Sequence, residues 1–218
     1  MTTGGLGFAD LEDWYRGPLG GRYLERCWQV ARELLEPLAG IQVLDAGCGA
    51  GHYSERLVEA GARVQGIDPD AGLVKQAQQR VPQGQFTVAP IEQLPFEPGP
   101  FERLLCSNVL EFVADPVRAL AELRRVSQSN AWAVVIVLAE HSLWQWQQQL
   151  FRPFSTHPYY QGQFFSATRL EQQSRAAGWR LEKLLPAVQF PPLPVAPLLD
   201  WSEGHFANAC WVARLCTD

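Results

Sequence analysis

Apolar and polar positions along the chain follow two periods, one typical of buried strands and one typical of amphipathic helices. Short apolar runs that predict strands are separated by segments with helical spacing. The predicted strands cover residues 41–47, 62–68, 84–89, 101–108, 131–140, 179–185 and 207–216. The predicted helices cover residues 21–40, 52–61, 69–81, 115–127 and 166–178. The alternation of strand and helix predicts an α/β fold, with a mostly parallel sheet and helices on both faces.

Three glycines on alternate positions, Gly47, Gly49 and Gly51, follow the first strand and precede a helix. In a parallel sheet such a turn lets backbone N–H groups and a helix N-terminus approach a ligand closely. Asp68 ends the second strand, where a carboxylate can accept both hydroxyls of an unphosphorylated ribose. The simpler alternative is that the glycines only form a turn and that Asp68 only caps a helix.

Composition and charge narrow the range of partners. The chain has 18 basic and 23 acidic residues, a net charge of -5, and no basic run, so we expect no nucleic-acid partner. The longest apolar run, AWAVVIVLA, is too short to span a bilayer, and the N-terminus lacks the pattern of a signal peptide. We therefore expect a cytoplasmic protein without stable membrane insertion. The five cysteines are scattered without zinc-ligand spacing, so no metal is expected.

The motifs VLDAGCGAG, VQGIDPD, IEQLPFEPGPFERLLCSNVLEFVADP and FFSATRLEQQSRAAGW resemble those of a known family. Over about residues 40 to 185 the chain is similar to the class I S-adenosylmethionine-dependent methyltransferases, in the small-molecule type 11 branch related to ubiquinone and menaquinone methylation. The resemblance implies a Rossmann-like sheet of seven strands whose last strand is antiparallel. It also implies S-adenosylmethionine as cofactor, S-adenosylhomocysteine as product, and a small-molecule acceptor.

The resemblance assigns roles to residues that match the motifs. It implies that Asp45 and the glycine turn surround the amino-acid part of the cofactor, that Asp68 binds the ribose, and that Pro69 lies against the adenine. The family usually has an acidic residue where this chain has Pro90, and often a histidine where it has Phe112. The implied cofactor residues are Asp45, Gly47, Cys48, Gly49, Gly51, Asp68, Pro69, Ile91, Glu92, Ser107, Asn108 and Leu110.

A single domain is expected over residues 1–218. Its first part, 1–40, is a helical segment, and residues 41–139 form the cofactor-binding half. Residues 140–218 form the substrate-side half, which contains an aromatic insert over 141–165 and a proline-rich loop over 186–206. We expect a monomer or a homodimer.

His141 is the candidate general base, because it follows the fifth predicted strand at the edge where cofactor and acceptor would meet. A histidine that caps the next helix is the competing interpretation. Aromatic residues near a sulfonium can contribute cation–π attraction, and those predicted to line the substrate pocket are Tyr15, Trp144, Tyr159 and Tyr160.

Two other functions remain open from the residues alone. A nicotinamide-dependent oxidoreductase is disfavoured, because His52 replaces the third glycine of G-x-G-x-x-G and no hydride-transfer constellation is present. A catalytically silent S-adenosylmethionine-binding regulatory or scaffold protein would keep the same cofactor motifs.

Overall fold

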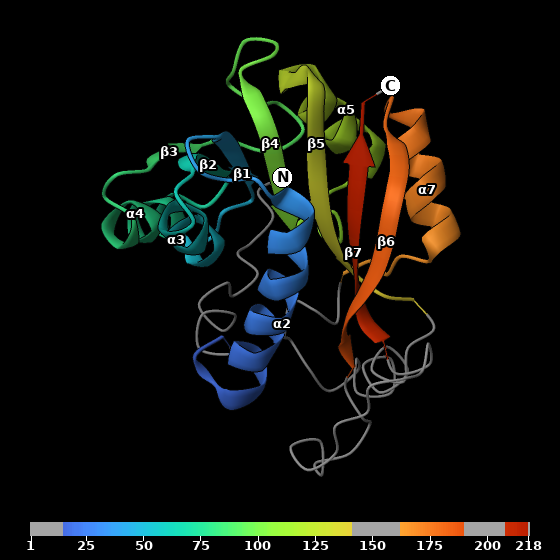
Figure 1. The fold of residues 1–218 in the computed structure, drawn as a ribbon, viewed down its shortest axis with the longest axis horizontal. Helices are drawn as coiled ribbons and strands as arrows, with labels where there is room; N and C mark the ends of the chain where they lie inside the picture. Colours follow the sequence, from blue (N-terminus) through green and yellow to red (C-terminus); the bar gives the residue numbers. More distant parts are fainter. Residues whose placement is uncertain (1–14, 141–161, 190–207, 218) are drawn as a thin grey trace.

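The computed structural model describes residues 15–140, 162–189 and 208–217, which form one seven-stranded sheet (Figure 1). The strand order is β3-β2-β1-β4-β5-β7-β6. β7 runs antiparallel to both of its neighbours, and the other pairs are parallel, as expected. The strands are β1 (Gln42–Ala46), β2 (Arg63–Asp68), β3 (Gln85–Val88), β4 (Phe101–Ser107), β5 (Ser127–Leu138), β6 (Arg180–Gln189) and β7 (Asn208–Cys216).

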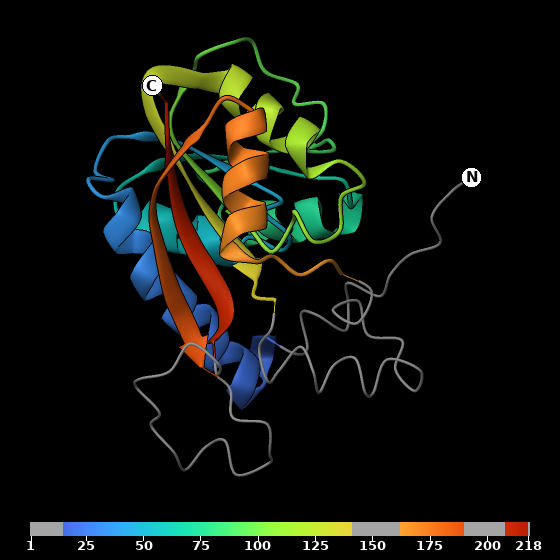
Figure 2. The ribbon, with the colours of Figure 1, turned by 90° about the vertical axis from the view of Figure 1, so that its right-hand side faces the viewer.

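Helices cover both faces of the sheet, and Figure 2 shows α5 and α7 on one side of the strands and α2 on the other. The described helices are α2 (Pro18–Leu35), α3 (His52–Glu59), α4 (Ala71–Arg80), α5 (Pro116–Val126) and α7 (Ala167–Ala176). None of them is long and apolar enough to cross a membrane.

Two hydrophobic cores result from the period-two alternation of the strands. In β1, Leu44 points into the core beneath α5 and α7, whereas Val43 points into the core beneath α2 and α3. Leu104 and Leu105 of β4 divide in the same way. Strands that are buried on both faces therefore read as continuous apolar runs, as expected for a parallel sheet.

Three element boundaries differ from the sequence prediction by four or five residues. The helix predicted to end at residue 40 ends at Leu35, because Glu36 precedes Pro37 and has an extended backbone with a ψ of 145°. β5 begins at Ser127 rather than at residue 131, because Ser127 pairs with Phe101 before the register shifts. β6 continues to Gln189, four residues into the segment predicted as a loop. Pro186 is compatible with this strand because β6 lies at the edge of the sheet, where a missing N–H breaks no ladder bond to a second neighbour.

Candidate functional site

The glycine turn lies between β1 and α3, and its three glycines have positive φ values of 82°, 52° and 85°. At Gly47 a Cβ atom would lie 2.1 Å from Cγ2 of Val109, so this glycine allows the turn after β4 to approach. At Gly49 a Cβ would meet no atom within 4 Å. Gly51 precedes α3 and packs against Ala77 of α4. Open space in front of the turn thus occurs at Gly49.

Asp68 stands beside this open space at the end of β2. Its Oδ2 accepts a hydrogen bond from the Gly49 N–H at 3.0 Å, and its Oδ1 accepts one from the Asp70 N–H at 2.9 Å. Burial raises the pKa of Asp68, while the two backbone hydrogen bonds act against this rise. Each carboxylate oxygen can accept further hydrogen bonds, so the side chain is oriented but not saturated.

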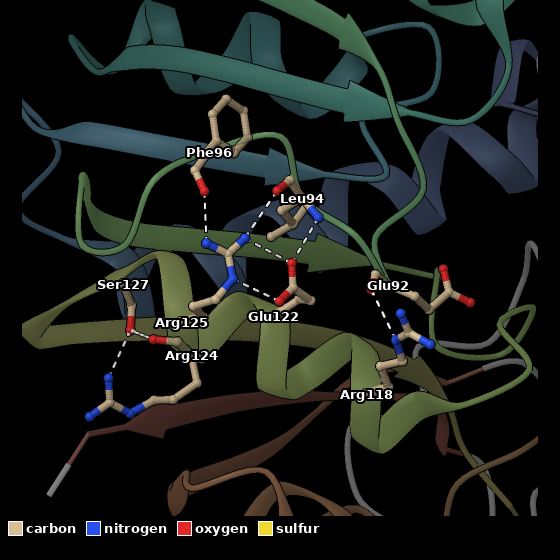
Figure 3. A network of polar contacts seen from close by, with 8 residues as sticks. All are labelled: Glu92, Leu94, Phe96, Arg118, Glu122, Arg124, Arg125 and Ser127. Atoms are coloured by element: carbon tan, nitrogen blue, oxygen red, sulfur yellow. Dashed lines mark hydrogen bonds and ion pairs between the residues drawn. The ribbon is translucent and has the colours of Figure 1, made fainter.

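The loop after β3 is fixed by polar contacts with α5 (Figure 3). The Arg125 guanidinium donates to the carbonyl oxygens of Phe96 and Leu94, and it also forms an ion pair with Glu122 at 2.7 Å. Arg118 Nε donates to the carbonyl oxygen of Glu92 at 3.2 Å. These bonds hold the predicted adenine-side residues against the helix.

A buried polar network follows β4. Asn108 has a φ of 52°, a conformation that asparagine adopts more readily than most residues. Its Oδ1 accepts from the Tyr23 hydroxyl at 2.9 Å, and its Nδ2 donates to Oε1 of Glu111 at 3.1 Å. The same Oε1 accepts from the Leu138 N–H at 2.7 Å. Glu111 therefore joins the ends of β4 and β5, and burial raises its pKa to about 7.

A cavity of about 390 Å³ opens at this edge of the sheet. Small-molecule sites usually measure about 300 to 1,000 Å³. Ten of the predicted site residues line it: Tyr15, Gly47, Cys48, Gly49, Asp68, Pro69, Ile91, Glu92, Ser107 and Asn108. Four elements far apart in the sequence, β1 to β4, thus contribute their carboxyl ends to one cavity.

Known methyltransferases are similar to this chain in sequence over the region that forms the cavity. Residues 44–135 match a family model described as "Methyltransferase domain". The chain is 35% identical over 163 residues to a ubiquinone biosynthesis O-methyltransferase of Xanthomonas euvesicatoria, covering 66% of this chain and 65% of the relative. It is also 35% identical over 113 residues to a malonyl-acyl-carrier-protein O-methyltransferase of Serratia marcescens, covering 50% and 44%. The chain belongs to the class I S-adenosylmethionine-dependent methyltransferases, in the type 11 branch.

A solved structure supports the fold of this methyltransferase over nearly its whole length. It is described as a S-adenosylmethionine-dependent methyltransferase, possible histamine N-methyltransferase, from Thermotoga maritima. The two chains superpose with a TM-score of 0.80 at 21% identity, covering 97% of this chain and 96% of the other. Both curated relatives, in contrast, are matched over less than two thirds of their own length.

Three predicted cofactor residues of the methyltransferase do not line the cavity. Asp45 lies behind the turn, where its Oδ2 accepts from the Ser54 hydroxyl at 2.5 Å and burial raises its pKa to about 7. Leu110 is fully buried in the core beneath α5. Gly51 supports the packing of α3 on α4. These positions contribute to the shape of the turn from behind.

Four other predicted residues lie outside the described part of the chain: His141, Trp144, Tyr159 and Tyr160. Two residues of the methyltransferase that the sequence analysis did not select have a place in the site. Glu111 is buried beside Asn108, and Tyr53 of α3 lines the cavity. A carboxylate within the apolar stretch VLEFV was the available signal for Glu111.

Proposed function

We propose that this chain transfers the methyl group of S-adenosylmethionine to a hydroxyl group of a small neutral molecule. The observation that carries the proposal is Asp68 beside the glycine turn, since a carboxylate with spare lone pairs adjoins open space at Gly49. This pairing suits a ribose diol that continues into a thioether chain. Family membership supports the same ligand.

The cofactor residues follow the order of the strands. The cavity residues Ile91 and Glu92 follow β3 and suit the adenine edge, with Pro69 against the ring. Asp68 suits the ribose, and the glycine turn with Cys48 suits the chain that leads from it. The backbone around Ser107 and Asn108 suits the amino-acid end. Three residues would support the cofactor-binding turn and strand ends from the protein interior without touching the cofactor: Asp45, Gly51 and Leu110.

The chemistry asks mainly for alignment, because the bound cofactor supplies an activated methyl group on a sulfonium. The residues of the chain then have to hold the acceptor in line with the transferred methyl and to exclude water. Such positioning can contribute on the order of 7 to 11 kcal/mol to lowering the barrier. The apolar residues of the cavity, among them Val109, Phe112 and Val113, are suited to this task.

The charge of the cavity favours a neutral acceptor. Its described lining residues include the carboxylates Asp68 and Glu92 but no lysine or arginine. A negatively charged acceptor would meet repulsion from these carboxylates, and no basic side chain of the described lining would offset it. A phenol, the kind of group that ubiquinone-type O-methylation modifies, fits this environment better than a malonyl carboxylate does.

We also propose His141 as the base that removes the proton of the hydroxyl acceptor. His141→Asn should lower turnover about 100- to 10,000-fold and leave S-adenosylmethionine affinity nearly unchanged. The rate of the native enzyme should fall below about pH 6.5, where an ordinary imidazole becomes protonated. This fall in the pH–rate profile should be absent in the variant. Full turnover with the same pH profile would show that His141 is structural.

The direct test of the function is S-adenosylhomocysteine production from S-adenosylmethionine with a panel of acceptors. The panel should contain phenols and quinols, matched carboxylic acids, thiols and amines. We expect release with phenols or quinols and none with the carboxylic acids. Cofactor binding without turnover on any acceptor would instead favour the silent binding protein.

A further inference from the structure

Phe112 lies on the wall of the cavity, in the loop that follows β4. The loop residues beside it that also line the cavity are apolar: Val109, Val113 and Ala114. None of these four residues is among those that suit the adenine, the ribose or the amino-acid end of the cofactor. This part of the lining is therefore left for the acceptor, and Phe112 supplies an aromatic ring to it.

Hydrogen bonds on both sides of Phe112 fix its backbone. The Phe112 N–H donates to the Val109 carbonyl oxygen at 2.9 Å. The Gln163 N–H donates to the carbonyl oxygen of Glu111 at 2.9 Å, and Nε2 of Gln163 donates to that of Val113 at 3.3 Å. Gln163 belongs to the aromatic insert predicted over residues 141–165, so the described end of this insert is bonded to the loop that carries the ring.

Gly162 limits where the Phe112 ring can lie. A Cβ atom at this glycine would lie 3.1 Å from Cε1 and 3.6 Å from Cζ of Phe112, and 3.3 Å from Cβ of Glu111. Carbon atoms in optimal contact are about 3.5 to 4.0 Å apart, so a side chain at residue 162 would press on the ring. Glu111 cannot give way readily, because it is buried and accepts a hydrogen bond from the Leu138 N–H of β5. The lack of a side chain at Gly162 thus sets the position of the ring.

We propose that Phe112 makes the acceptor site selective for aromatic hydroxyl compounds, and that Gly162 acts through Phe112 by setting the position of its ring. This rests on the proposed function. An aromatic acceptor gains offset-stacked or edge-to-face contact with Phe112, and a saturated ring of the same skeleton does not. The charge of the cavity selects neutral acceptors, and Phe112 selects the aromatic ones among them.

The test compares two neutral probes by calorimetry on the full chain saturated with S-adenosylhomocysteine. The probes are 2-naphthol and its saturated analogue decahydro-2-naphthol. The native protein should bind 2-naphthol about fivefold more tightly, and Phe112→Leu, which keeps an apolar side chain, should bind both about equally. Gly162→Ala should weaken 2-naphthol binding about threefold in the native protein but should have almost no effect in the Phe112→Leu variant, because the two residues act together. Affinity for S-adenosylhomocysteine should stay within about twofold in every variant.

Phe96→Leu is the matched control. Phe96 is also half-buried, but its ring packs on Phe101 at the opposite end of β4, with ring centroids 5.0 Å apart, so this substitution should leave the preference for 2-naphthol unchanged. Equal binding of the two probes by the native protein, or binding of neither, would overturn this inference alone if S-adenosylhomocysteine is still bound. A preference that survives in Phe112→Leu would do the same, and an equal effect of Gly162→Ala in both backgrounds would overturn the role of Gly162. If the native protein does not bind S-adenosylhomocysteine, the proposed function fails as well.

Discussion

Asp68 and Glu111 are both buried carboxylates at the carboxyl edge of the same sheet, but their surroundings differ. Both oxygens of Asp68 accept from backbone N–H groups, and the residue lines the cavity. Glu111 lies outside the cavity lining and uses one oxygen to hold Asn108 and Leu138 together. Burial alone therefore does not identify a ligand-binding carboxylate. A ligand-binding carboxylate is identified by free lone pairs that face the cavity.

The largest effect expected from this comparison concerns stability at Glu111. Glu111→Ala would leave the Asn108 amide and the Leu138 N–H unsatisfied in the interior, so the free energy of unfolding should fall by about 2 to 5 kcal/mol. Glu111→Gln keeps an oxygen acceptor for both donors, so it should lower the free energy of unfolding by much less. Urea unfolding measures the difference, and equal losses in the two variants would contradict the assigned role.

The next effect concerns affinity at Asp68. Asp68→Ala should weaken S-adenosylhomocysteine binding at least tenfold, because two hydrogen bonds to a charged group are lost, each worth about 1.5 to 3 kcal/mol. Its effect on unfolding should stay near 1 kcal/mol or below, since burial already disfavours the ionised carboxylate.

Asp70→Ala is the matched control for this experiment. Asp70 caps α4 by accepting from the Gly72 and Leu73 N–H groups, so its loss should cost about 1 kcal/mol of stability and little affinity. Calorimetry should show the larger loss of affinity in Asp68→Ala, and urea unfolding should show a loss of stability in Asp70→Ala. If Asp70→Ala weakened S-adenosylhomocysteine binding as much as Asp68→Ala does, the assignment of Asp68 to the ligand and of Asp70 to the helix cap would be wrong.

A smaller effect is expected in the pH dependence of stability. The pKa of Glu111 is about 7 in the folded protein against an ordinary value of 4.5, so the folded state binds more protons between these values. Stability should therefore decline as the pH rises from about 4.5 to 7, by at most about 1.4 kcal/mol per pH unit from this group. Asp45, whose pKa is also raised to about 7, contributes a similar decline, so Glu111→Gln should remove only about half of the slope. An unchanged slope in unfolding titrations at pH 5, 6 and 7 would show that Glu111 does not titrate there.

The sequence was sufficient to predict the sheet, the glycine turn and Asp68, because each has a local signal. Alternating apolar runs, glycines on alternate positions and a carboxylate at a strand end are visible in a few consecutive residues. The antiparallel β7 was confirmed as well, although that expectation came from the family resemblance.

The places of Tyr53 and Glu111 could not be predicted in the same way. Tyr53 occupies an apolar helix position, and only the folded structure shows that its ring packs against Trp28 and that the residue lines the cavity. Glu111 depends on the approach of Leu138, 27 residues away in the sequence. The extension of β6 through Pro186 likewise depends on its place at the sheet edge. Such features depend on tertiary contacts, which have no local pattern.

The most direct test of the central claim is a calorimetric titration of the full chain with S-adenosylhomocysteine and, separately, with NAD. We expect one S-adenosylhomocysteine bound per chain and no NAD binding, because Asp68 and the glycine turn suit a ribose linked to a thioether chain. NAD binding in the absence of S-adenosylhomocysteine binding would contradict it.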